Sequence, residues 1–152
     1  MRAAYKVLAY LIALEVMIQA AAIAYAMFGV GKWVEEGGVL DKAAMESDST
    51  DFDGIVGFMV HGMNGMMLIP LIALLLLIVS FFAKVPGGVK MAAGIVVLVV
   101  VQVMLGMFAH EMPGLGALHG INALLLLGAA AAAGKRADKP VSKDTGVEHQ
   151  MV

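Results

Sequence analysis

Four long apolar segments alternate with polar stretches along the chain. The apolar segments cover about residues 7–30, 54–82, 91–110 and 116–133. At a helical rise of about 1.5 Å per residue, segments of this length cross the roughly 30 Å of hydrocarbon in a bilayer. A helix also satisfies its own backbone hydrogen bonds, which lipid requires of a spanning segment. The pattern predicts an all-α integral membrane protein with four transmembrane helices within residues 1–134.

The polar stretches predict how these spans are connected. Residues 31–53 are acidic and predict a water-facing outer loop, whereas residues 135–152 predict a flexible tail. Pro70 lies inside the second span, where the missing N–H predicts a kink. The first apolar segment is longer than the hydrophobic region of a signal peptide, so we expect it to remain as a span.

The basic residues predict the orientation of the spans. Lys32 and Lys42 lie in the predicted outer loop, and the other eight Lys and Arg all flank the opposite ends of the spans. Positively charged connections are retained in the cytoplasm. We therefore expect a multi-pass protein of the cell membrane with both termini in the cytoplasm and residues 31–53 outside.

Composition excludes several classes of protein. Hydrophobic residues make up 61% of the chain and charged residues 14%, and the mean hydropathy is +0.91. A soluble domain of this size cannot keep so many apolar side chains off its surface. Cysteine is absent, so the 13 Met are the only soft metal ligands. The sequence contains neither a nucleotide-binding loop nor a nucleic-acid-binding stripe, so the expected partners are the lipid bilayer and a redox partner or larger complex within it.

The two halves of the chain carry the same polar residues in the same order. Each half has a glutamine in its first span and a His-x-x-Asn pattern early in its second span. The two sets are Gln19, His61 and Asn64, then Gln102, His119 and Asn122. A direct repeat of two hairpins is naturally related by an axis along the membrane normal. The repeat predicts a four-helix bundle built from two hairpins, with these six side chains facing inward.

The paired histidines favour a b-type haem as the ligand of this bundle. His61 and His119 lie near the outer ends of the second and fourth spans, where two imidazoles could bind one iron from opposite faces. The four amide side chains are then candidates to orient the imidazoles: Asn64, Asn122, Gln19 and Gln102. Iron with two axial histidines has no open position, which favours electron transfer over catalysis.

Three other interpretations of the polar and sulfur-containing residues stay open. Copper would use thioethers and imidazole at the outer end of the third span, from Met104, Met107, His110 and Met112. In a structural interpretation, the amides only join helices in lipid, and the protein is an accessory subunit of a larger complex. Glu15, near the middle of the first span, is a candidate to carry protons or contact a quinone headgroup, or it simply pairs with a neighbouring helix.

Two resemblances follow from these motifs. The order Gln19, His61-x-x-Asn64, Gln102 and His119-x-x-Asn122 resembles an uncharacterised family of small four-span membrane proteins common in actinobacteria. The layout of a long outer loop followed by histidines in spans two and four is similar to one four-helix half of haem A synthase. That resemblance implies haem contacts for His61 and His119 only. The Glu-x-x-His stretch, the His-Arg signature and the loop cysteines of that family are absent, so it does not imply synthase activity.

Overall fold

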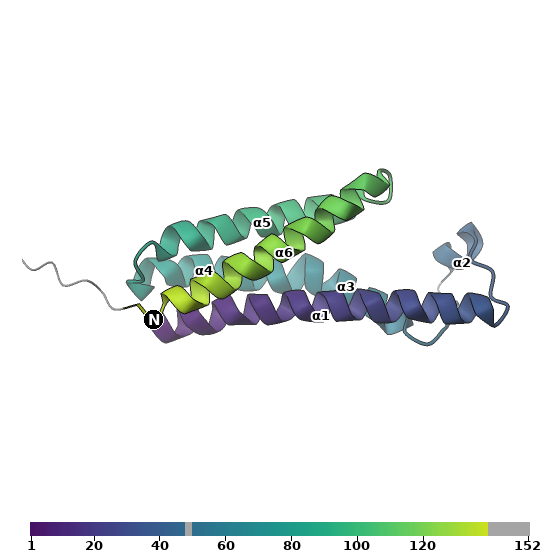
Figure 1. The fold of residues 1–152 in the computed structure, drawn as a ribbon, viewed down its shortest axis with the longest axis horizontal. Coiled ribbons are helices and arrows are strands. Elements are labelled where there is room, and N and C mark those ends of the chain that lie inside the picture. The colour runs from purple at the N-terminus through teal and green to yellow at the C-terminus, as the bar shows by residue number, and fades with distance from the viewer. Residues whose placement is uncertain (48–49, 140–152) are drawn as a thin grey trace, which may run out of the picture.

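The computed structural model describes residues 1–47 and 50–139, and its secondary structure is entirely helical within these ranges (Figure 1). Four helical segments are long and apolar enough to cross a membrane. They are α1 (Arg2–Glu35), the continuous run of α3 (Ile55–Met63), η1 (Asn64–Leu68) and α4 (Ile69–Ala83), then α5 (Gly88–Phe108) and α6 (Pro113–Arg136). A short helix, α2 (Lys42–Glu46), lies in the first connection. The predicted all-α membrane fold with four spans is confirmed.

The four spans form a ring in which each helix packs on its neighbours in sequence. The first hairpin consists of α1 with α3, η1 and α4, and the second of α5 and α6; α4 packs on α5, and α6 returns to α1. Figure 1 shows the end of α6 beside the start of α1. There Lys6 pairs with Asp138 at 2.8 Å. This end of the bundle also contains the α4–α5 turn, and we call it the basic end. We call the opposite end the loop end.

The apolar core lies in the half of the bundle nearer the basic end, and it repeats between the hairpins. In α1 the buried positions include Tyr5, Ala9, Ile12 and Val16. The buried positions of α5 are Gly88, Ala92, Ile95 and Val99, each 83 positions later. The same spacing separates Gln19 from Gln102. The first helices of the two hairpins therefore use equivalent faces, as the sequence repeat predicts.

The second helices of the hairpins differ by one residue, which the π-helical turn η1 accommodates. His61 and His119 are 58 positions apart, as are Asn64 and Asn122. Beyond η1 the equivalent buried residues are only 57 apart: Ile69 and Leu126, Ala73 and Ala130, Leu76 and Ala133, Ser80 and Ala137. A π turn holds one extra residue without breaking the helix, and such turns are frequent at functional sites. The π turn ends at Leu68, and Pro70 is the second residue of α4; the kink expected at this proline stays a prediction.

Two helices continue beyond the predicted spans and make tertiary contacts there. The predicted loop 31–53 is wrong in its first residues, because α1 continues to Glu35. Lys32 in its last turn binds Asp53 at 2.7 Å, and Trp33 stacks on Phe52. The hydrogen bond from Lys32, together with its charge, lowers the pKa of Asp53. This contact is therefore lost only as the pH falls through that lowered pKa.

The tail predicted from residue 135 also begins later than expected. α6 continues to Arg136, whose guanidinium Nε donates to the Pro86 carbonyl, and Ala137 is buried. These contacts fix the last turn of α6 against the α4–α5 turn. The remainder of the predicted tail, residues 140–152, lies outside the described residues.

Candidate functional site

The repeated polar residues lie directly beyond the apolar core, toward the loop end. Val16 and Val99 are the last residues of α1 and α5 in the main core cluster, and Gln19 and Gln102 follow one turn later. Gln19 and Asn122 are buried, and the other four members of the set are partly buried. The two hairpins thus place their polar residues at the same level of the bundle.

His61 and His119 face each other across the two hairpins. Each is the seventh residue of its helix, since α3 begins at Ile55 and α6 at Pro113. Their ring centres are 6.0 Å apart, with the ring planes inclined at 59°. The fourth span was expected to begin near residue 116, which would put His119 closer to the boundary than His61. Proline favours the first turn of a helix, and Pro113 starts α6 three residues earlier, which equalises the two depths.

Both imidazoles are oriented by a main-chain carbonyl of their own hairpin. His61 Nδ1 lies 3.2 Å from the Gln19 carbonyl oxygen, and His119 Nδ1 lies 3.0 Å from that of Gln102. A carbonyl only accepts hydrogen bonds, so Nδ1 is the donor in each contact and a neutral imidazole keeps its lone pair on Nε2. Histidines that bind metals are commonly held in this way through their second nitrogen. Thus the main chain of each glutamine contacts the imidazole, while the orienting role assigned to the amide side chains stays a prediction.

The asparagines make hydrogen bonds within their own hairpins. Asn122 Nδ2 donates to Gln102 Oε1 at 2.6 Å and to the Leu98 carbonyl at 2.9 Å. Asn64 Nδ2 donates to Glu15 Oε2 at 3.2 Å. Glu15 and Leu98 are equivalent positions of the repeat, 83 residues apart, so one hairpin offers a carboxylate where the other offers a main-chain carbonyl. Gln19 Nε2 completes the first hairpin with a bond to the Val60 carbonyl at 3.4 Å.

Glu15 is a buried carboxyl group with an amide partner. Only 7% of the residue is exposed, and its position on α1 is one turn closer to the core than Gln19. Of the alternatives open from the sequence, pairing with a neighbouring helix is visible in the bond from Asn64. A role in proton transfer or quinone contact stays a prediction.

The residues considered for copper are exposed at the loop end of the second hairpin. Met104, Met107, His110 and Met112 all have exposed side chains. Within the ranges 1–47 and 50–139, no group of three or more His, Cys, Asp or Glu side chains gathers as a metal ion would need. The copper hypothesis, which relies on thioethers, stays a prediction.

Gly106 is a site residue that the sequence did not single out. A Cβ atom at this position would lie 3.1 Å from His119 Cε1, so a larger residue would require the imidazole to shift by a few tenths of an ångström. Gly106 is one of 18 glycines and belongs to no repeated motif. Its role depends on the packing of α5 against α6, which sequence spacing does not reveal.

The fold and the matched polar residues define a small multi-pass membrane protein with a paired-histidine site between two helical hairpins. Residues 51–110 match a family of unknown function, DUF6220. The match covers α3 to α5, including His61, Asn64 and Gln102, and it ends before α6 and His119. No curated protein and no solved structure matches the chain.

Proposed function

We propose that this protein is a small membrane cytochrome that binds one b-type haem between His61 and His119 and transfers electrons. The observation that carries the proposal is the facing pair of imidazoles, each with Nδ1 on a glutamine carbonyl. A metal–imidazole bond is about 2 Å long, so two imidazoles on opposite sides of one metal ion would have ring centres about 6 Å apart. The observed separation of 6.0 Å fits that requirement.

The surroundings of the histidine pair suit a flat apolar ligand. Gly106 lies against the His119 ring, and Gly65 lies beside the Gln19 side chain. Within the described residues, α5 buries no side chain beyond Val99, and α6 buries none before Asn122. α3 packs on α1. Few side chains of α5 and α6 are therefore buried at the level of the histidines, and apolar side chains there are available to contact a porphyrin.

The histidines and carbonyls have separate roles in this proposal. His61 and His119 would hold the iron, and the Gln19 and Gln102 carbonyls would fix the two rings and strengthen them as ligands. A haem bound there would supply one-electron redox chemistry, with both axial positions taken by histidine.

A structural role is the second candidate, and the amide contacts favour it. The bonds from Asn64 to Glu15 and from Asn122 to Gln102 each join two helices of one hairpin. Such bonds contribute about 0.6 kcal/mol each in a membrane. An accessory subunit without a cofactor would need no more than these contacts, but it would not need the two histidines to face each other.

An absorption spectrum separates these two candidates. Protein purified from haem-replete cells, or titrated with haemin, should show the low-spin spectrum of iron with two axial imidazoles and a stoichiometry of one haem per chain. Metal analysis of the same sample detects copper. Folded protein that stays colourless during the titration would refute the cytochrome proposal, and copper in stoichiometric amounts would favour the thioether site.

We also propose that both termini lie in the cytoplasm of a cell-membrane protein, because eight of the ten basic residues lie at the basic end or in the segment beyond it. The chain lacks cysteine, so single cysteines report position without background. Val39→Cys, in the outer connection, should react with an impermeant maleimide on intact cells. Lys90→Cys, at the basic end, should react only after the cells are opened. The reverse result would invert the proposed orientation.

Glu15 can be tested by replacing its carboxyl group in two ways. Glu15→Gln retains an oxygen that accepts from Asn64, so its stability in a denaturant titration should stay close to the original. Glu15→Leu removes the acceptor and should lower the free energy of unfolding by about 1 kcal/mol. If Glu15 carries a redox-linked proton, Glu15→Gln should also abolish the pH dependence of the haem midpoint potential. Equal stability of the two variants would contradict the pairing role.

A further inference from the structure

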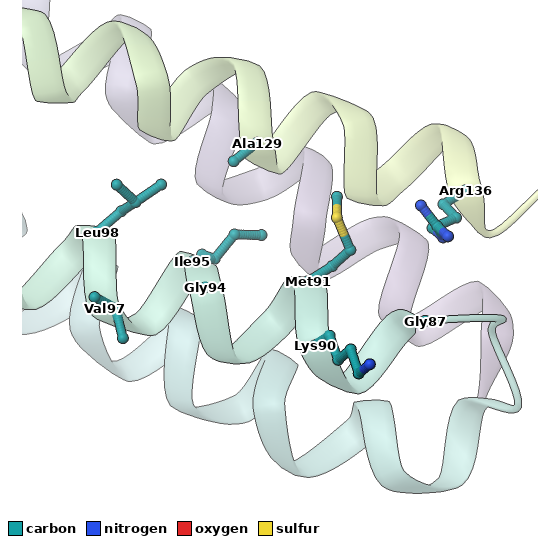
Figure 2. Close-up of a pocket in the computed structure, with 9 residues that line it drawn as sticks. All are labelled: Gly87, Lys90, Met91, Gly94, Ile95, Val97, Leu98, Ala129 and Arg136. Atoms are coloured by element: carbon teal, nitrogen blue, oxygen red, sulfur yellow. The ribbon is translucent and has the colours of Figure 1, made fainter.

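A groove on the second hairpin runs along α5 and α6 toward the basic end of the bundle. Figure 2 shows Leu98 and Val97 at one end and Gly87, Lys90 and Arg136 at the other. Its volume is about 580 Å³, and between these ends its lining is apolar. Gly94 and Ala129 have little or no side chain to fill the space between the helices. The charged end of the groove is remote from the histidine pair. Its other end reaches Leu98, whose main-chain carbonyl accepts from Asn122.

The charged end of the groove is built into the fold. Arg136 is fixed by its bond to the Pro86 carbonyl, and this uses one of the five N–H donors of a guanidinium. Lys90 lies on the first turn of α5 and is exposed. In the described residues of the basic end, the only acidic side chain is Asp138, which pairs with Lys6. The charge at this end of the groove is thus complementary to an anion.

The length of the groove matches a membrane lipid. From Gly87 to Leu98 an α-helix rises about 16 Å, roughly half the thickness of the hydrocarbon region. An acyl chain that begins at the membrane surface would cover the same distance within one leaflet. Basic residues beside an apolar groove between membrane helices are the pattern that binds acidic headgroups.

We propose that this groove binds an anionic phospholipid. Its phosphate lies between Lys90 and Arg136, and one acyl chain lies over Gly94 toward Leu98. The lipid thereby ties the α4–α5 turn to the end of α6. This proposal does not depend on haem binding.

Native mass spectrometry with defined lipids tests the groove. Full-length protein is given equal amounts of phosphatidylglycerol and phosphatidylcholine with identical acyl chains, and the original sequence should retain the anionic lipid preferentially. Lys90→Gln should reduce that retention about fivefold and leave phosphatidylcholine unchanged, because one basic residue near an anionic headgroup is worth roughly this factor. Lys42→Gln, an exposed lysine in the outer connection, is the matched control and should retain both lipids as before.

Gly94→Leu tests the acyl-chain part of the groove, because it fills the space while leaving the charges in place. This variant should retain less of both lipids. In a separate competition with the original sequence, glycerol phosphate, which has no acyl chains, should not displace bound lipid. Equal retention of the two lipids by the original sequence, or equal effects of Lys90→Gln and Lys42→Gln, would overturn the proposal. A dimer that Gly94→Leu dissociates would also overturn it, by showing that a second copy of the chain covers the groove.

Discussion

His61→Ala and His119→Ala should each abolish the low-spin haem spectrum. In the proposed site each imidazole supplies one of two axial bonds, so losing either leaves iron with a different coordination and spin state. Absorption and electron paramagnetic resonance spectra of the purified variants measure this loss. Added imidazole should restore the low-spin signal in a variant that still binds haem, because a small ligand can enter the space left by the ring.

His110→Ala is the matched control for this experiment. His110 is exposed beyond the end of α5 and is not part of the facing pair, so its removal should leave the spectrum unchanged. A purely structural role would give a different pattern, with altered stability and no spectral change in any variant. Low-spin haem retained in both His61→Ala and His119→Ala would rule out this pair as the axial ligands.

Gly29→Ala should strongly destabilise the first hairpin. A Cβ atom at Gly29 would lie 1.7 Å from the Asp53 carbonyl oxygen and 2.9 Å from its carbon. Both are main-chain atoms, so the clash cannot be relieved by a side-chain rotation, and α1 would have to move away from the start of α3. We expect a loss of about 2–4 kcal/mol in the free energy of unfolding, measured by denaturant titration in detergent.

Gly31→Ala provides the control two residues later on the same helix. Nothing lies within 4 Å of a Cβ atom at this position. Alanine also favours a helix over glycine by up to about 1 kcal/mol, so this variant should be unchanged or slightly more stable. Similar stabilities for Gly29→Ala and Gly31→Ala would mean that the close contact between α1 and residue 53 does not hold the hairpin together.

The positions of the helix ends show that hydropathy predicts the membrane-spanning part of a helix but not where the helix ends. Within the bilayer an apolar segment must be helical, so the four spans follow from the sequence pattern alone. Beyond the hydrocarbon a helix ends where its contacts end. The last turn of α1 contains Lys32, which contacts Asp53, and the last turn of α6 contains Arg136, which contacts Pro86, although both segments have polar sequences.

The sequence predicted which residues form the candidate site but not which hydrogen bonds they make. The repeated His-x-x-Asn patterns and their glutamines identified the polar residues, because such groups are costly in lipid and conspicuous in an apolar chain. The partners that hold the imidazoles are main-chain carbonyls, which every residue has and no motif marks. The contact between Gly106 and His119 was likewise invisible, since one glycine among many has no distinguishing spacing.

By itself, the sequence determined the number of spans, the repeat of two hairpins and the polar residues that each contributes. The physical reason is that long apolar segments must be helical in lipid. The repeat is visible because the same polar residues occur in the same order in both hairpins. Only the tertiary structure decided that His61 and His119 lie at equal depth, that Asn64 meets Glu15, and that the π turn before Pro70 absorbs one extra residue. These features depend on how one helix is rotated and shifted against its neighbours. Side-chain packing sets that register, and a hydropathy pattern does not contain it.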